Sequence, residues 1–231
     1  MNEEITTYHG YDIAISQDDD AESPREWDNL GTMVCWHSRY DLGDEQPKEC
    51  DPWDYMLATL DTILKDTHMP SLRDELEALL HRWWDGDDIP REEVEVEFDK
   101  HFVRLPLYLY DHSGITMSCA PFSCSWDSGQ VGFIYAHRSK QHELGKGHTL
   151  EEVLKAEVEV YDQYLTGDVW CYRIEDKDGD TIDSCCGFYG EEDCMSEAKS
   201  AVDYQVEQDR LKHQARLKRL IKSKVPFEHR V

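Results

Sequence analysis

The sequence predicts an α+β fold in which an antiparallel sheet, made of a meander and a C-terminal hairpin, packs with helices and is followed by a long C-terminal helix. Three observations support this class. Strand-like and helix-like segments are grouped along the chain more than they alternate. Apolar runs in two regions flank turn sequences rich in Asp, Ser and Gly. A long helical segment near the C-terminus changes from acidic or mixed to basic along its length, as the helix dipole favours.

The N-terminal part predicts two strands separated by a polar loop. Residues 10–16 (GYDIAIS) have the composition of a first strand. Residues 17–29 are polar and begin with an acidic run, so they predict a loop that leads into a short turn of helix. A second strand is predicted over 32–37, because turn-forming Asn and Gly residues precede it.

A helical region is predicted over 51–99. Its clearest helix opens at Ser71, which can act as a cap, and ends at Gly86, with leucines at helical spacing between them. A preceding helix is predicted over 51–65. Residues 90–102 fit a third helix, but residues 94–98 fit a strand with period two equally well, so both alternatives stay open.

Residues 103–138 predict a small antiparallel meander. Strand-forming residues lead into the turn sequence Asp111-His112-Ser113-Gly114, after which a short strand returns. The sequence Trp126-Asp127-Ser128-Gly129 predicts a second turn, and a strand over 131–137 follows it. Asp, Ser and Gly suit such turns because the Asp side chain caps the backbone and Gly accepts positive φ.

The last third of the chain predicts a helix, a hairpin and the long helix. Thr149 and Glu152 form a capping box that starts a helix reaching residue 165. Residues 169–176 and 181–188 flank a Lys-Asp-Gly-Asp turn, which is a strong hairpin signal. The long helix is predicted over about 196–222. We therefore expect an acidic α+β domain over 1–194, with a helical insertion at about 51–99, and a C-terminal helix with a basic end over 195–231.

Charge is the dominant feature of the composition. The 231 residues contain 50 Asp and Glu against 24 Lys and Arg, for a formal net charge of −26. Residues 205–231 carry eight bases and three acids, so the first 204 residues hold 16 bases and 47 acids. Such a body repels nucleic acid and anionic membranes and attracts basic partners. High solubility or a salt-adapted host is the simpler explanation of the same charge.

No targeting or membrane segment is predicted. The first fifteen residues lack a basic start and an apolar run, and no stretch approaches 18 consecutive apolar residues. The eight cysteines show no compact repeated spacing, so we expect them to be reduced. Cys119 and Cys124, with Cys35 and His37, are conceivable zinc ligands, but no CxxC pair exists, and no metal or cofactor is predicted.

Catalytic motifs give no clear assignment, and the chain is predicted not to be an enzyme. A calcium loop at residues 176–187 fails because Thr181 stands where Gly is needed and Gly187 where Glu is needed. No GxSxG elbow or phosphate-binding loop is present. A thiol dyad of Cys119 or Cys124 with His112 or His137 is a further candidate, but nothing in the sequence brings these residues together.

The candidate binding residues combine polar groups with large aromatics, a mixture typical of recognition surfaces as well as cores. They are Asp18, Asp19, Asp20, Arg25, Trp27, Asp28, Asp111, His112, Ser113, Trp126, Asp127 and Ser128. If a pocket exists, we expect it between the two glycine turns. The densest acidic runs are 18–20, 85–88 and 92–97.

Three segments also suggest an origin. They are 23–33 (SPREWDNLGTM), 105–117 (LPLYLYDHSGITM) and 121–135 (PFSCSWDSGQVGFIY). Together with residues 161–167 they resemble a family of uncharacterised proteins carried by bacteriophages, plasmids and other mobile elements. The resemblance covers roughly two-thirds of the chain, and the family has Pro where Ser125 stands here. It implies a mobile-element origin and action in the host cytoplasm, but no activity, cofactor or site residue.

Two classes of function follow. The preferred class is an accessory protein that antagonises a host defence or nucleic-acid-handling protein by direct binding, as an acidic nucleic-acid mimic of the anti-restriction or anti-CRISPR type. About 31 excess charges match ~53 Å of duplex DNA, close to the diameter of about 45 Å expected for a chain of this length. The alternative is a small enzyme or ligand-binding domain built on the two turns.

The predicted partner is a basic host protein or nucleoprotein complex, without direct contact to nucleic acid or membrane. The basic stripe of Lys212, Arg216 and Arg219 recurs at helical spacing near the C-terminus. Since the rest of the chain is acidic, this stripe is expected to dock on the protein's own acidic surface or on a second copy, which makes a homodimer through the C-terminal helix a candidate assembly.

Overall fold

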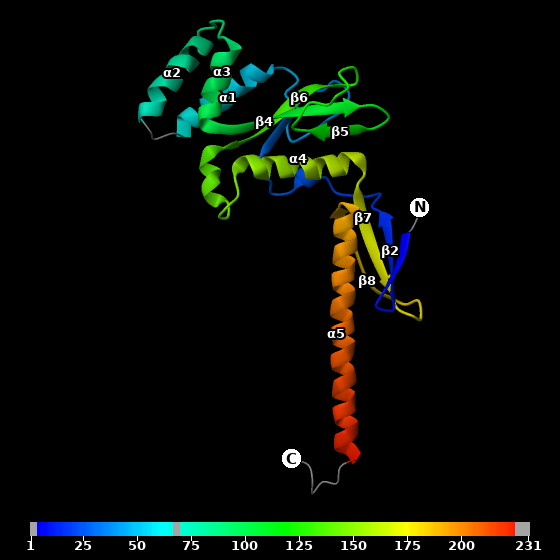
Figure 1. Cartoon of the computed structure of the whole chain (residues 1–231). Coiled ribbons are helices and arrows are strands. Elements are labelled where there is room, and N and C mark those ends of the chain that lie inside the picture. Colours follow the sequence, from blue (N-terminus) through cyan, green and yellow to red (C-terminus); the bar gives the residue numbers. More distant parts are fainter. Residues whose placement is uncertain (1–3, 67–69, 225–231) are drawn as a thin grey trace. The chain divides into compact units, whose positions relative to one another are not determined.

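The computed structural model describes residues 4–66 and 70–224 (Figure 1). Two compact units divide the chain, and one of them is built from both ends of it. The first unit comprises Met1–Glu22 and Gly167–Val231, and the second comprises Ser23–Thr166. Each unit has its own antiparallel sheet and its own apolar core, so each is described separately.

The unit Ser23–Thr166 contains one four-stranded sheet and four α-helices. The strands are β3 (Thr32–Cys35), β4 (Phe102–Asp111), β5 (Ile115–Ser118) and β6 (Ser128–His137), in the order β3-β6-β4-β5. The α-helices are α1 (Pro52–Asp66), α2 (Pro70–Trp84), α3 (Arg91–His101) and α4 (Leu150–Thr166). Two short 3-10 helices, η1 (Pro24–Glu26) and η2 (Arg138–Glu143), complete it.

The sheet of this unit is covered on both faces (Figure 1). Met33 and Ile134 point to the α4 side and pack with its Leu154, whereas their neighbours Val34 and Phe133 point to the side of α1, α2 and α3. This follows from the period of two in a strand, which sends successive side chains to opposite faces. The strands are therefore apolar on both sides, and a three-layer arrangement results.

The segment that fitted both a helix and a strand is the helix α3. Val94, Glu97, Phe98 and His101 are its buried residues, at the i, i+3, i+4, i+7 spacing of one helix face. Phe98 stacks on Phe102 with ring centroids 4.4 Å apart, which ties the end of α3 to the start of β4. The apolar alternation around residues 94–98 was misleading because Val96 is 62% exposed and contributes nothing to the core.

The predicted capping box of α4 is present. The Thr149 N–H donates to the Glu152 carboxylate over 2.8 Å, and the Glu152 N–H donates back to Thr149 Oγ1 over 3.2 Å. These backbone and side-chain hydrogen bonds from Thr149 hold the pKa of Glu152 below its ordinary value of 4.5. The helix start that was inferred from two residue types is therefore made by the expected reciprocal bonds.

Thr149→Ala is expected to lower the free energy of unfolding by about 1 kcal/mol, because the cap hydroxyl is lost. Since the capped Glu152 has a lowered pKa, its contribution is present above pH 4.5 and is lost as the pH falls through the lower folded value. Urea unfolding at neutral pH should show the deficit, and the deficit should shrink at acid pH. Thr62→Ala, an exposed position inside α1, is the control; an equal loss there would contradict the capping role.

The unit of Met1–Glu22 and Gly167–Val231 contains a second four-stranded sheet. Its strands are β1 (Glu4–Tyr8), β2 (Tyr11–Gln17), β7 (Val169–Glu175) and β8 (Thr181–Tyr189), in the order β1-β2-β7-β8. The strand β1 was not predicted because its residues are mostly exposed and polar. It pairs with β2 through His9 and Gly10, whose φ values of 51° and 83° suit a tight two-residue hairpin turn.

The long helix α5 (Glu191–Lys224) covers one face of this sheet. Cys194, Ala198 and Val202 recur every four residues along it and pack against a cluster that includes Ile13 and Ile174. Small residues at this spacing let the helix approach the strands closely. The Tyr11 hydroxyl of the hairpin β1-β2 donates to the Asp209 carboxylate of the helix over 2.8 Å, and the basic stripe lies beyond this contact (Figure 1).

The α+β class is confirmed, as are the antiparallel pairing and the long C-terminal helix. The meander and the C-terminal hairpin belong to different sheets, because β7 pairs with β2 from the N-terminal segment. No helix among the described residues is long and apolar enough to cross a membrane.

Candidate functional site

The two predicted glycine turns lie side by side at one end of the sheet of the Ser23–Thr166 unit. The β4–β6 pairing places Tyr110 opposite Ser128, so the turns that follow β4 and precede β6 come together. The Asp111 N–H donates to the Asp127 carbonyl over 2.8 Å. We call Asp111–Gly114 and Trp126–Gly129 the turn pair.

Asp127 is the centre of the polar contacts in the turn pair. Its carboxylate lies 3.3 Å from His112 Nδ1 and accepts a weak bond from the Cys124 thiol over 3.8 Å. The Ser128 hydroxyl donates to the Cys124 carbonyl. A nucleophilic site would need the thiol or hydroxyl to contact the imidazole. Among the described residues, the Cys124 thiol and the His112 imidazole each contact Asp127 instead, and the Ser128 hydroxyl bonds the Cys124 carbonyl.

Asp111 and Ser113 shape the turn pair. The Asp111 carboxylate pairs with Arg39 and accepts from the Tyr40 hydroxyl over 3.3 Å. Ser113 has a φ of 60°, a backbone conformation that few non-glycine residues adopt. Trp126, by contrast, is 94% exposed at the tip of its turn. Trp126 is therefore the residue of the turn pair that is most open to a partner.

Arg25 is a buried member of an ion-pair cluster. Its side chain is only 5% exposed and contacts Asp44 over 2.6 Å and Glu157 over 3.0 Å, and it donates to the Gly31 carbonyl over 2.8 Å. Glu157 also accepts from the Leu30 N–H over 2.8 Å. The cluster connects the loop after η1 to α4 and to the start of β3. Its neighbours Trp27 and Asp28 lie on the surface.

In the part of the chain that the structure describes, Cys119 and Cys124 are not grouped with further metal-ligating side chains, because neither belongs to a set of three such residues with close donor atoms. Burial raises the pKa of the Cys119 thiol above its ordinary value of 9.0, which disfavours the thiolate that a nucleophile or ligand requires. Burial raises the pKa of Cys35 to about 12 for the same reason.

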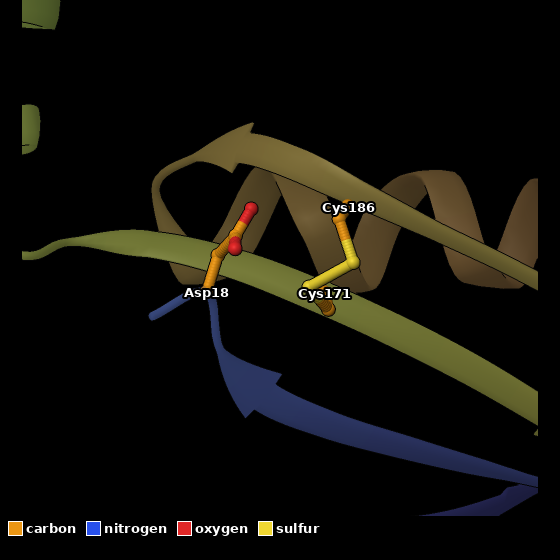
Figure 2. Close-up of side chains that lie close together, drawn as sticks. All are labelled: Asp18, Cys171 and Cys186. Atoms are coloured by element: carbon orange, nitrogen blue, oxygen red, sulfur yellow. A yellow bond between two sulfur atoms is a disulfide. The ribbon is translucent and has the colours of Figure 1, made fainter. Parts of the chain in front are cut away.

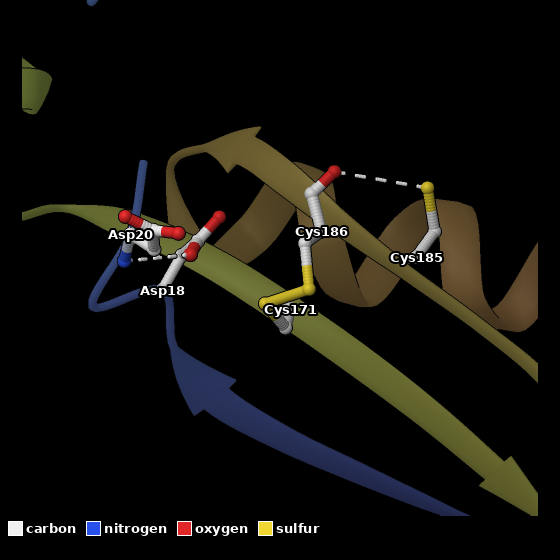
Figure 3. Close-up of a disulfide and its surroundings, with 5 residues drawn as sticks. All are labelled: Asp18, Asp20, Cys171, Cys185 and Cys186. Atoms are coloured by element: carbon white, nitrogen blue, oxygen red, sulfur yellow. Dashed lines mark hydrogen bonds between the residues drawn. A yellow bond between two sulfur atoms is a disulfide. The ribbon is translucent and has the colours of Figure 1, made fainter. Parts of the chain in front are cut away.

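The expectation that all cysteines are reduced is wrong, because Cys171 and Cys186 form a disulfide between β7 and β8 (Figure 3). The register shifts between Trp170 and Tyr172, so that Cys186 and Gly187 together oppose Cys171. Gly187 has a φ of 83°, as such a bulge requires. A sequence signal existed, because the two cysteines are equally spaced about the Asp178-Gly179 turn and therefore meet across the hairpin.

Asp18 is placed beside this disulfide. Its carboxylate and the two sulfur atoms all lie within 4.8 Å of one another (Figure 2). Among the described residues this is the one group of three metal-ligating side chains found this close together. Asp19 and Asp20 follow it in the same loop and are exposed. The predicted residues 18–20 thus lie in a different unit from Arg25 and the turn pair.

The densest acidic surface of the Ser23–Thr166 unit lies on α2, α3 and the loop between them. Residues 70–101, which we call the acidic helix pair, contain eleven Asp and Glu against four Lys and Arg. A groove of about 600 Å³ runs between the two helices. It is lined by Glu75, Ala78, Leu79, Arg82, Glu92, Glu93, Val96, Glu97 and Lys100.

A second cavity, of about 270 Å³, lies where α1 meets β4 and β6. Trp36, Trp53 and Phe133 provide aromatic walls, and Glu95 and Arg104 provide charges. The Trp53 indole donates to Glu95 over 3.1 Å, and Arg104 lies 3.4 Å from the same carboxylate. The polar groups of this cavity therefore bond to one another.

Comparison with known proteins found no matching family model, no matching curated protein and no matching solved structure. The similarity to mobile-element proteins consequently stays a prediction from the sequence. The fold and its sites describe an acidic α+β protein of two units, with an acidic groove, a turn pair and a disulfide beside a carboxylate.

Proposed function

We propose that the protein is a binding protein, which holds a basic segment of a partner protein in the groove of the acidic helix pair. By occupying that segment it would antagonise a host defence or nucleic-acid-handling protein, without chemistry of its own. The observation that carries the proposal is the concentration of eleven acids against four bases in residues 70–101, around a groove with an exposed apolar side chain.

Ion pairs occupy most of the charged side chains that line the groove, and the carboxylates left over lie at Glu92 and in the adjoining loop. Arg82 pairs with Glu93, and Lys100 pairs with Glu75 and Glu97, and these pairs connect α2 to α3. Among the described side chains, none forms an ion pair with Glu92. Asp85, Asp87 and Asp88 add exposed charge in the loop that joins the helices. A basic segment would find uncompensated carboxylates at the end of the groove, in this loop and at Glu92.

The exposed Val96 side chain favours a protein segment, rather than small counterions, as the ligand of the groove. It is 62% exposed and lies in the groove beside Ala78 and Leu79. An apolar centre surrounded by charge is the usual composition of a protein interface. The stem of a Lys or Arg side chain can cover such an apolar patch while its charged end reaches a carboxylate. The same groove repels nucleic acid, which is consistent with a mimic of it.

The variant Asp87→Asn, Asp88→Asn, Glu92→Gln is expected to weaken binding of a fluorescent Arg-rich peptide by about tenfold. Each exposed charge contributes up to about 0.5–1 kcal/mol, and three together reach the 1.4 kcal/mol that corresponds to a factor of ten. Fluorescence anisotropy at low and high salt measures the effect. Wild-type binding should fall steeply with salt, because screening removes the attraction.

The matched control removes the same number of charges elsewhere on the unit. Glu49→Gln, Glu143→Gln, Glu151→Gln neutralises three exposed acids outside the acidic helix pair. It should leave the affinity within about twofold of the wild type, since distant exposed charges are largely screened. Equal losses in both triple variants would show that net charge alone attracts the peptide, and the proposed groove would be wrong.

A separate variant distinguishes this proposal from a function of the turn pair. Asp127→Ala removes the carboxylate that His112 and Cys124 share. Peptide binding and antagonism of a DNA-binding restriction nuclease in a bacterial host should both survive this change. If both are lost with Asp127→Ala but retained in the Asp87, Asp88, Glu92 variant, the turn pair is the binding site and the groove is not.

A further inference from the structure

We propose that Asp18, Cys171 and Cys186 form a Zn²⁺ site that exists only when the disulfide between the two cysteines is reduced. The proposal does not depend on the acidic helix pair, which belongs to the other unit. It rests on the position of a carboxylate beside two sulfur atoms that neighbouring strands hold together (Figure 2).

The spacing of the donor atoms fits a small thiophilic cation. A tetrahedral zinc ion binds sulfur at about 2.3 Å and carboxylate oxygen at about 2.0–2.2 Å, so its ligand atoms lie roughly 3.5–3.8 Å apart. The three donor atoms here lie within 4.8 Å of one another. Reduction releases the two sulfur atoms from their bond, and small side-chain rotations then suffice to surround an ion.

The backbone fixes the three ligands independently of the disulfide. Cys171 lies opposite Ser16 in the β2–β7 pairing. Asp18 comes two residues after Ser16, just past the end of β2, so it lies near Cys171. The Asp18 N–H donates to the Val169 carbonyl over 2.8 Å, which continues the strand pairing to Asp18 itself. Cys186 lies in the bulge between Cys185 and Phe188, which pair with Tyr172 and Trp170 of β7. The site would therefore persist when the sulfur–sulfur bond opens.

A second contact orients the carboxylate. The Asp20 N–H donates to Asp18 Oδ1 over 3.1 Å (Figure 3), which leaves Oδ2 available to an ion. Such outer contacts commonly position the ligands of metal sites. Cys186 is exposed, so water can reach the site and complete the coordination. The neighbouring acids Asp19 and Asp20 add negative charge that attracts a cation.

Cys185 is adjacent in sequence but lies outside this group. It stands opposite Tyr172 in the pairing of β7 and β8, and Tyr172 belongs to the core that α5 covers. Successive residues of a strand face opposite sides, so Cys185 and Cys186 point to different faces of the sheet. Its sulfur contacts the Cys186 carbonyl over 3.7 Å (Figure 3). Cys185 therefore provides a matched control thiol.

Reduction of the Cys171–Cys186 disulfide is a balanced reaction when the reductant is a dithiol. The dithiol gives two electrons and two protons to the Cys171–Cys186 bond and becomes a cyclic disulfide, and the protein gains two thiols. Zn²⁺ then displaces the two thiol protons and binds both thiolates and the Asp18 carboxylate. In the oxidised protein the sulfur atoms carry no thiolate, so a single carboxylate remains and binding is weak.

The test measures Zn²⁺ binding to the full chain by competition with a chromophoric chelator, after treatment with an oxidant or with a phosphine reductant. We expect one equivalent to bind to the reduced protein and affinity at least tenfold lower in the oxidised protein. Cys171→Ser, Cys186→Ser and Asp18→Asn should each lower the affinity of the reduced protein by at least about tenfold, since even the loss of a residue that only orients a ligand costs about 10- to 100-fold. Cys185→Ser should leave it unchanged.

Co²⁺ in place of Zn²⁺ identifies the ligands directly. The sulfur-to-cobalt absorption should be present in the reduced wild type and in Cys185→Ser, and it should weaken in Cys186→Ser. Asp18→Asn preserves the shape of the side chain, so it keeps the test valid if a cysteine variant fails to fold. Equal Zn²⁺ affinity in the oxidised and reduced proteins, no binding by the reduced protein, or loss of binding in Cys185→Ser would each overturn the proposal.

Discussion

Arg25→Met is expected to destabilise the Ser23–Thr166 unit by about 3–5 kcal/mol, the cost of removing one partner from a buried ion pair. The Arg25 side chain is 5% exposed and Glu157 is 12% exposed, so both charges are withdrawn from water. Without the guanidinium, Asp44 and Glu157 would face each other uncompensated, and the Gly31 carbonyl would lose its donor. Methionine keeps the apolar stem, so the loss reports on the charge.

Urea unfolding followed by tryptophan fluorescence measures this effect selectively. Six of the seven tryptophans lie in the Ser23–Thr166 unit, and only Trp170 lies in the other. Arg82→Met is the control, because its ion pair with Glu93 is about 40% exposed and should contribute less than about 1 kcal/mol. If Arg25→Met loses no more than Arg82→Met, the cluster does not hold the loop to α4 as described.

Gly132→Ala is expected to cost about 3 kcal/mol or more, because an added methyl group would overlap the neighbouring backbone. A Cβ at this position would lie 1.9 Å from the Val34 carbonyl oxygen and 3.0 Å from Cys35 Cα. Both atoms belong to β3, which pairs with β6 at this point, so the clash falls on backbone that no side-chain rotation can relieve. The expected result is loss of β3 pairing and a lower midpoint of urea unfolding.

Gly129→Ala provides the comparison within the same strand. A Cβ at Gly129 would meet no atom within 4 Å, and its backbone needs no positive φ. Its effect should stay within about 0.5 kcal/mol of the wild type. Similar destabilisation by the two alanine variants would mean that glycine acts through chain flexibility rather than through the close approach of β3.

The predicted site residues show which features of the candidate site follow from neighbouring residues in the sequence and which depend on distant ones. The turn pair was predicted from Asp, Ser and Gly at two places, and the structure brings the turns together because the strands next to them pair. Arg25 was singled out by residue type alone. Its burial depends on Asp44 and Glu157, which lie 19 and 132 residues away in the chain, and no local pattern indicates such partners.

The disulfide is the opposite case, because the sequence contains a local signal for it. Cys171 and Cys186 are symmetric about the predicted hairpin turn, so their proximity follows from the hairpin itself. The absence of repeated cysteine spacing argues against a disulfide framework, but it says nothing about one pair that a hairpin brings together. The third member, Asp18, directly follows β2, whose pairing with β7 the sequence does not indicate.

The sequence by itself determined the features that depend on near neighbours: the α+β class, the helix start at Thr149, the turn chemistry and the strongly negative charge. These follow from side-chain periodicity and from bonds within a few residues. Only the tertiary structure decided that the N-terminal strands join the C-terminal hairpin in one sheet, that Arg25 is buried and that Asp18 lies beside two cysteines. Such contacts join residues far apart in the chain. Each helix or strand is locally stable in many tertiary arrangements, and the burial of several apolar faces at once selects one of these arrangements.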